Sequence, residues 1–160
     1  MSSKTEIVAE PGSPRISMRR IVDAKRELVF DAFTKPELVT RWKGPRDFKV
    51  TLIEVDLRPG GKWRINYRLP NGADMGFYGE YSEVVRPEKI VRTFCFDGKP
   101  GKLIESIVFE ALGDRTNILT TTDYESVEAR DATLKSMGPA GLGDAYDRLD
   151  ELIVELLKGT

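Results

Sequence analysis

The residues that could carry out chemistry are limited first by composition. The 160-residue chain has no histidine and one cysteine, Cys95. Serine–histidine and cysteine–histidine nucleophile pairs are therefore excluded, as are zinc sites with histidine ligands. A single cysteine also excludes an internal disulfide and a cysteine-bound iron–sulfur cluster. We expect no metal and no cofactor, so acid–base chemistry would have to use Asp, Glu, Tyr, Lys or ordered water.

A charged pair in two apolar strands is the most specific candidate site. Arg92 and Glu105 lie on either side of a glycine- and proline-containing connection at residues 97–102. If Phe96 pairs with Leu103 across this connection, Arg92 and Glu105 become diagonal neighbours on one face of the sheet. Long side chains can bridge that separation.

Two threonines of the next predicted strand extend this candidate site. A short turn places Thr120 opposite Ile107, and Thr122 opposite Glu105. We expect a polar cluster of Arg92, Glu105, Thr120 and Thr122 inside an otherwise apolar pocket. In the alternative, this face points to water and the ion pair contributes little to stability.

Large apolar side chains alternate with polar ones in a neighbouring segment, 62–69. Trp63, Ile65 and Tyr67 share one face, which is typical of a strand with one covered face and one wet face. The covered face forms either ordinary core or the lining of a pocket, where tyrosine hydroxyls could orient a ligand. The residues that we expect to line such a pocket are Trp42, Phe48, Trp63, Ile65, Tyr67, Tyr81, Arg92, Phe94, Glu105, Ile107, Thr120, Thr122, Met137, Leu142 and Tyr146.

The charge distribution gives no sign of a polyanionic partner. The chain has 25 basic and 26 acidic residues and a net charge of −1. Lys62, Arg64 and Arg68 form a basic stripe, but the aromatic residues needed to stack nucleic-acid bases fall on the opposite face. We therefore expect no nucleic acid. No apolar run is long enough to span a membrane, so we also expect no membrane contact and a cytoplasmic location.

The elements that must position these residues follow from periodicity and turn residues. Residues 1–14 predict a flexible arm, and 15–160 predict a single domain. Asp23 is a candidate N-cap for a helix with an apolar face, and Pro36 begins a second short helix. The strands that we expect are Arg15–Val22, Val50–Leu57, Lys62–Leu69, Met75–Val84, Lys89–Phe96, Leu103–Ala111 and Thr116–Tyr124.

The last third of the chain changes to a helical period. An apolar stripe over 142–157 predicts an amphipathic helix, and 126–137 also has a helical pattern. Residues 138–141, which contain two glycines and a proline, should break or kink the join. A movable gate at the pocket mouth, formed by residues 138–143 with Trp42 and Phe48, is the alternative role for this segment.

Together these patterns predict an α+β fold. A curved antiparallel sheet of six to seven strands wraps around a long C-terminal helix, and two short helices lie between the first and second strands. This order resembles the SRPBCC or START-like superfamily of helix-grip (Bet v 1-like) folds. It is most similar to the family named after the activator of the heat-shock-protein-90 ATPase. The segments that carry the resemblance are Glu27–Leu38, Arg41–Pro45, Asp56–Trp63, Gly79–Tyr81, Arg86–Val91, Glu128–Asp131 and Tyr146–Leu149.

The resemblance implies the fold and several functions. Leu142 stands where family members often carry Trp, and Lys35 replaces a frequent Asp before Pro, so the resemblance implies the fold but not the shape of the pocket. Binding of a small apolar molecule is the leading function. A cyclase- or hydrolase-like enzyme using a buried carboxylate with Tyr and Arg is an alternative. The family name implies a further alternative, a chaperone-regulating module in the stress response. A homodimer also stays open.

Overall fold

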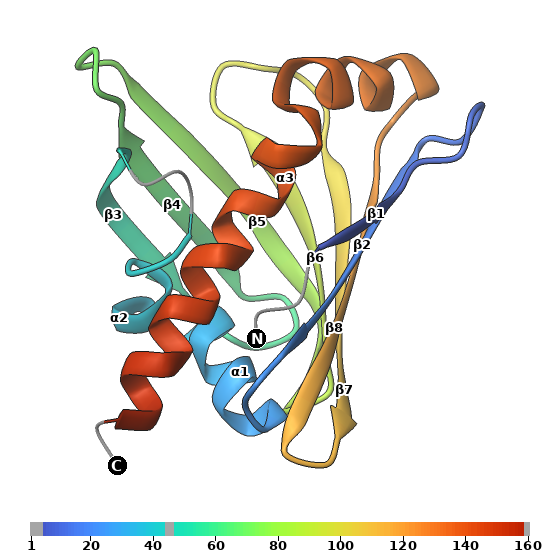
Figure 1. Cartoon of the computed structure of the whole chain (residues 1–160). Coiled ribbons are helices and arrows are strands. Elements are labelled where there is room, and N and C mark those ends of the chain that lie inside the picture. The colour runs from blue at the N-terminus through green and yellow to red at the C-terminus, as the bar shows by residue number, and fades with distance from the viewer. Residues whose placement is uncertain (1–4, 44–46, 159–160) are drawn as a thin grey trace.

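The chain forms an open antiparallel sheet with helices on its concave side (Figure 1). The computed structural model describes residues 5–43 and 47–158, and of these the side chains of 136–144 lie outside the description. The strands are β1 (Glu6–Val8), β2 (Arg15–Val22), β3 (Lys49–Val55), β4 (Lys62–Arg68), β5 (Asp74–Val85), β6 (Lys89–Phe96), β7 (Leu103–Leu112) and β8 (Arg115–Asp123). The helices are α1 (Arg26–Thr34), α2 (Pro36–Val39) and α3 (Val127–Lys158).

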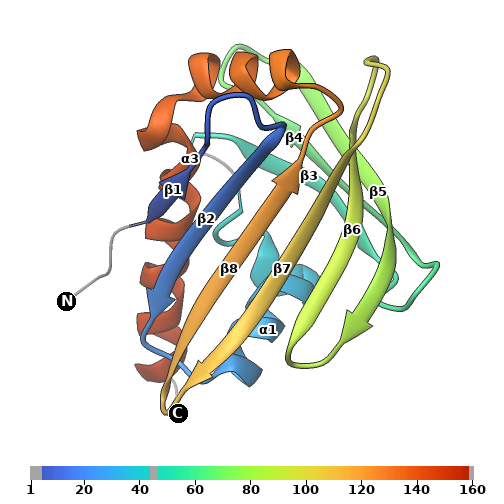
Figure 2. The ribbon, with the colours of Figure 1, turned by 90° about the vertical axis from the view of Figure 1, so that its right-hand side faces the viewer.

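The strands are ordered β1-β2-β8-β7-β6-β5-β4-β3. Every neighbouring pair is antiparallel, and Figure 2 shows β2, β8, β7, β6 and β5 side by side. The prediction of six to seven strands is wrong, because the described part of the chain contains eight. The additional strand is β1, inside the segment expected to be an arm, where Ile7 pairs with Met18. Three residues are too few to show a periodic pattern in the sequence.

Helices α1 and α2 lie between β2 and β3, where the sequence places two short helices. Val29 and Ala32 of α1, which are three residues apart on the predicted apolar face, are fully buried, and so is Phe30. The N-cap of α1 is Lys25, which makes no side-chain cap hydrogen bond, so the prediction of Asp23 is wrong. Instead, an Asp23 carboxylate oxygen accepts a hydrogen bond from Nε of Arg115 at 2.9 Å. The carboxylate is held by the β7–β8 end of the sheet rather than by the helix.

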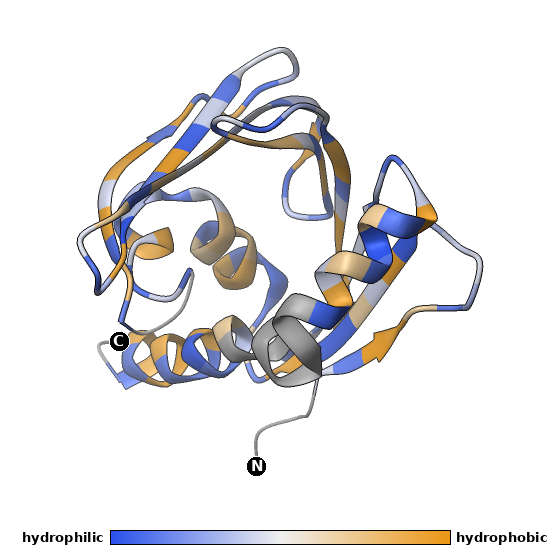
Figure 3. Ribbon diagram, turned by 90° about the horizontal axis from the view of Figure 1, so that it is seen from above, coloured by the Kyte–Doolittle hydropathy of each residue, from blue (hydrophilic) through white to orange (hydrophobic). Residues whose placement is uncertain are grey.

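Helix α3 crosses the open side of the curved sheet. Figure 3 shows the sheet as an arc with α1 inside it and α3 along its open side. Buried Arg20 of β2 joins the sheet to α3 through two ion pairs. Its partners are Asp150 and, at 2.9 Å, Asp147. The element is one helix over 127–158 and changes direction along its length (Figure 1). A proline within a helix removes a hydrogen bond and favours such a bend.

The core is fully packed where α1 and the C-terminal half of α3 meet the sheet. Phe30, Phe109, Ile118 and Leu149 come from four elements, and each is at most 1% exposed. The rings of Phe30 and Phe109 meet edge to face, with centroids 5.4 Å apart. This packed end anchors the sheet and α3. The remaining inner-face residues of β4–β7 belong to the region described next.

None of the helices in the described part of the chain combines the length and the low charge that a bilayer-spanning helix needs.

Candidate functional site

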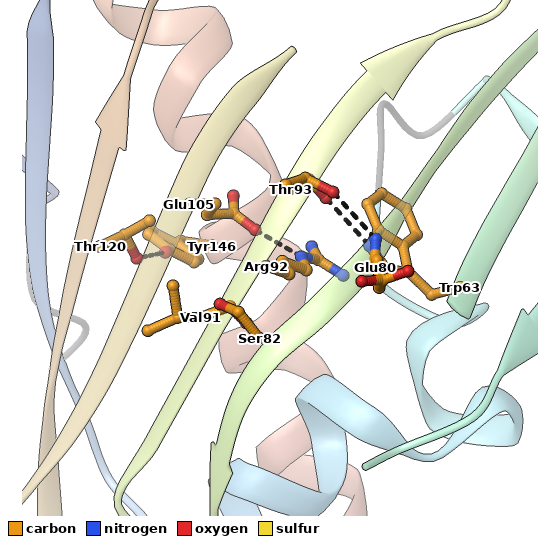
Figure 4. A network of polar contacts seen from close by, with 9 residues as sticks. All are labelled: Trp63, Glu80, Ser82, Val91, Arg92, Thr93, Glu105, Thr120 and Tyr146. Atoms are coloured by element: carbon orange, nitrogen blue, oxygen red, sulfur yellow. Dashed lines mark hydrogen bonds and ion pairs between the residues drawn. The ribbon is translucent and has the colours of Figure 1, made fainter. Parts of the chain in front are cut away.

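A charged pair lies on the inner face of the sheet, among aromatic residues. Arg92 of β6 is the direct cross-strand partner of Glu105 of β7. Its Nε donates a hydrogen bond to a carboxylate oxygen of Glu105 at 2.7 Å (Figure 4). The predicted diagonal arrangement is wrong, because Leu103 pairs with Phe94 rather than with Phe96. A shift of two residues keeps every side chain on its face, so the predicted charged pair still forms.

The Arg92–Glu105 pair is enclosed but keeps some accessible surface. The side chains are 11% and 14% exposed. The Arg92 guanidinium lies 4.1 Å from the centre of the Trp63 ring, and its charge also interacts with Tyr81. Burial opposes ionisation of Glu105, but Arg92 and Lys43 outweigh it and hold the pKa of the carboxyl below its usual value. Glu105 is therefore a carboxylate at neutral pH.

Lys43 is a second basic side chain of this region. It follows α2, its side chain is half-buried, and its Nζ lies 5.3 Å from the centre of the Trp42 ring. Burial lowers the pKa of Lys43, while the charge of Glu105 favours the protonated amine and that of Arg92 opposes it. Lys43 thus lies within electrostatic range of Arg92 and Glu105, and these three residues, from a loop and two strands, are called the charge cluster.

Tyrosine hydroxyls lie on both sides of the charge cluster. Tyr146 of α3 and Thr120 of β8 share a hydrogen bond of 2.6 Å between their hydroxyl oxygens (Figure 4). Both side chains are buried, so this bond joins α3 to the inner face of the sheet. Burial raises the pKa values of Tyr146 and Tyr81, which keeps both phenols protonated at physiological pH.

Aromatic side chains form a continuous wall beside the charge cluster. The wall begins at Phe48 and ends at Trp63 and Phe96, and the centroids of neighbouring rings lie 5.0 to 6.1 Å apart. The residues of this aromatic wall are Phe48, Trp63, Tyr67, Phe77, Phe94 and Phe96. Only Trp63 and Tyr67 among them are fully buried. The wall therefore keeps accessible aromatic surface, unlike the packed end of the core.

Trp63 is fixed in place by the sheet backbone. Its indole N–H donates to the carbonyl oxygen of Thr93 at 3.1 Å, and the Thr93 hydroxyl accepts from the N–H of Glu80 at 3.0 Å (Figure 4). Gly79 lies opposite Trp63 in the β4–β5 ladder. A Cβ at Gly79 would lie 1.9 Å from the Thr93 carbonyl oxygen and 2.7 Å from the indole nitrogen. The ring position therefore requires a glycine.

The other predicted site residues fall into three groups. Trp42 is part of the packed end, where its indole donates to the Ala32 carbonyl oxygen at 2.8 Å, and Ile65 and Ile107 are also buried in the core. Thr122 is half-buried opposite Glu105, as predicted, although no hydrogen bond between their side chains is described. The side chains of Met137 and Leu142, and the gate expected at 138–143, lie outside the described residues.

Lys43, Phe77 and Phe96 are absent from the residues predicted from the sequence to line the pocket. Phe77 continues the alternation Met75, Phe77, Gly79 and Tyr81, so strand periodicity could have identified it. Lys43 follows a short helix in a segment without periodicity. Only tertiary packing brings it close to Arg92 and Glu105, and no sequence pattern could have indicated that contact.

The outer face of the sheet carries the basic stripe. Arg64 forms a bidentate ion pair with Asp97, at 2.7 and 2.9 Å, and Arg68 pairs with Asp74 at 3.0 Å. These carboxylates neutralise two of the three basic residues. Among the side chains that the structure describes, no group of three or more Cys, Asp or Glu residues that could hold a metal ion comes together.

The lowered pKa of Glu105 predicts how the ion pair responds to acid. Because the folded-state pKa lies below the usual value of 4.5, the unfolded chain binds the proton more readily, and the ionised pair stabilises the fold above that pH. We expect the difference in unfolding free energy between wild type and Glu105→Gln to be constant from pH 8 to about 5.5. It should shrink as the pH falls through the folded-state pKa. Urea unfolding of both proteins across this pH range measures the difference in unfolding free energy. A difference that grows toward low pH would contradict the lowered pKa of Glu105.

Comparison with solved structures places the fold among bacterial proteins. A protein of Rhodobacter sphaeroides shares 25% identity over 95% of this chain and 99% of its own, with a TM-score of 0.87. A protein of Nitrosomonas europaea gives 20% identity, 90% and 96% coverage and a TM-score of 0.82. One from Chromobacterium violaceum gives 25% identity, 87% and 96% coverage and a TM-score of 0.75. The chain therefore has the helix-grip fold of these proteins.

Sequence comparison identifies the family. No curated protein matches the chain. The family model described as "Activator of Hsp90 ATPase homolog 1-like protein" matches residues 23–154, from the residue after β2 to the last turns of α3. That stretch includes the charge cluster, the aromatic wall and Tyr146. The chain belongs to the family of activator of Hsp90 ATPase homolog 1-like proteins.

Proposed function

We propose that the protein binds a small hydrophobic molecule between the inner face of the sheet and α3, with residues 15–160 acting as one START-like domain. The observation that carries this proposal is the half-buried state of four aromatic residues on that face. Phe48, Phe77 and Phe94 pack against the hydrophobic core but are only half-buried. Phe96, also half-buried, contacts the rings of Phe77 and Phe94. An apolar ligand that covered these rings would gain about 25 cal/mol per Å² of apolar surface removed from water.

The charge state of Glu105 favours binding over catalysis. A carboxylate that acts as a general base at neutral pH needs a pKa raised toward neutrality. The pKa of Glu105 is lowered instead, by Arg92 and Lys43. Family membership is compatible with small-molecule or chaperone interaction, and the accessible aromatic wall supports the small molecule. The free, half-buried Cys95 is consistent with a reducing, cytoplasmic location.

A neutral fluorescent probe tests the proposed function. We expect N-phenyl-1-naphthylamine to bind saturably with one site per chain and to be displaced by the neutral alcohol decan-1-ol. Phe94→Ala should weaken binding about tenfold, because it removes a ring worth about 1.5–3 kcal/mol when buried. Tyr78→Ala, on the outer face of β5, is the matched control and should bind as wild type does. Equal affinity of wild type and Phe94→Ala, or no saturable binding, would reject the proposal.

A further inference from the structure

Strand β3 is an edge of the sheet, and its free side has backbone groups available for pairing. It lies at one end of the strand order, and within the described residues only β4 pairs with it (Figure 1). The N–H of Asp56 donates to the carbonyl oxygen of Lys62, and the backbone groups of a strand alternate between its two sides. The N–H and C=O groups of Ile53 and Val55 therefore face away from β4, where a further strand could pair with them.

The β-bulge of β3 divides this strand into two halves of matching exposure. The register shifts between Val50 and Leu52, which leaves Thr51 as the extra residue of the bulge. Val50 and Ile53, one on each side of the bulge, are both half-buried against the core. The two residues of the bulge are exposed, and apolar Leu52 is 40% exposed. A twofold axis through the bulge would therefore place half-buried residues opposite half-buried ones and exposed residues opposite exposed ones.

The charges of β3 are symmetric in position and opposite in sign. Lys49, opposite Arg68 in the β3–β4 ladder, is exposed on the outer face of the sheet. Glu54, opposite Arg64, is exposed on the same face. Lys49 and Glu54 are about 16 Å apart along an extended strand, so they cannot contact each other within one chain. An antiparallel second copy of β3 would bring each of them beside its opposite charge.

We propose that β3 pairs with the β3 of a second copy of the chain, antiparallel and about a twofold axis through the bulge, so that two sheets join into one. In this homodimer each Lys49 faces the Glu54 of the other copy, and each Val50 faces the other Ile53. The two Leu52 side chains lie close to the axis, where they cover each other. A bulge hinders pairing with an unrelated strand because it breaks the register. The twofold axis places bulge opposite bulge, so the edge favours its own copy.

Charge reversal tests this interface, with analytical ultracentrifugation as the measurement. We expect the dimer fraction of wild type to rise with concentration. Glu54→Lys and Lys49→Glu should each weaken dimerisation about tenfold, because either change places like charges opposite each other twice. An equimolar mixture of the two variants should restore dimers, since every charge in the heterodimer faces its opposite. A wild type that stays monomeric up to about 1 mM would overturn the proposal.

Two further variants control for the change in net charge. Glu80→Lys on β5 and Lys102→Glu in the β6–β7 connection make the same charge changes at exposed positions away from β3. Both should dimerise as wild type does, and circular dichroism checks that every variant is folded. Dimers that persist unchanged in Glu54→Lys and Lys49→Glu would show that the interface lies elsewhere and would overturn the proposal. A mixture that remains as monomeric as its two components would overturn it as well.

Discussion

Gly79→Ala should destabilise the protein by about 3 kcal/mol or more, although it adds a single methyl group. The new Cβ would meet the Thr93 carbonyl oxygen at 1.9 Å and the Trp63 indole nitrogen at 2.7 Å. The first of these is a backbone atom in the neighbouring strand. Relief therefore requires β5 and β6 to separate at this point and Trp63 to shift as well. Urea unfolding monitored by circular dichroism measures the loss of unfolding free energy.

A glycine in open space provides the control for this substitution. Gly98, in the β6–β7 connection, has a φ of 77°, and a Cβ added there would have no atom within 4 Å. Gly98→Ala should lower the unfolding free energy by only about 1–2 kcal/mol, because alanine is less stable than glycine in a left-handed backbone conformation. Equal losses in Gly79→Ala and Gly98→Ala would show that the indole and the Thr93 carbonyl do not limit the space at Gly79.

Arg92→Met should lower the unfolding free energy by about 3 kcal/mol, because it leaves the enclosed Glu105 carboxylate without its partner. The double variant Arg92→Met/Glu105→Leu removes both charges and replaces them with apolar side chains of similar size. We expect it to lie within about 1 kcal/mol of wild type, since apolar pairs often replace buried ion pairs without loss. Lys43 then lacks its carboxylate partner, which limits any gain in stability.

The single variant Glu105→Leu completes a thermodynamic cycle that measures the coupling energy between Arg92 and Glu105. A coupling energy near zero between Arg92 and Glu105 would contradict an enclosed ion pair and would match an exposed one. Urea unfolding of wild type, the two single variants and the double variant measures this coupling energy.

The sequence predicted the face of each inner residue better than its exact partner. Strict alternation in β4 placed Trp63, Ile65 and Tyr67 correctly in the interior, because a period of two follows from strand geometry alone. The pairing of Arg92 depended on where the β6–β7 connection begins. The strands pair only from Phe94 and Leu103 onward, two residues earlier on β6 than predicted. Nothing in the sequence indicates the length of the β6–β7 connection.

The rest of the candidate site depends on contacts between distant segments. Lys43 reaches the charge cluster from the loop after α2, and Trp63 inserts its indole toward the carbonyl of Thr93, 30 residues later. Neither contact follows from local periodicity, since both require the curvature of the whole sheet. The short strand β1 was missed for a different reason: its pairing with β2, not its composition, makes it a strand.

The placement of the two tryptophans gives each region of the interior its own optical reporter. The chain has two tryptophans, and Trp42 lies in the packed end while Trp63 lies in the aromatic wall against Arg92. Excitation of indole in Trp42→Phe therefore reports the neighbourhood of Trp63, where a bound molecule would change the emission. In Trp63→Phe the emission reports the packed end alone. Intrinsic fluorescence can thus distinguish occupancy of the wall from unfolding of the core, without an added label.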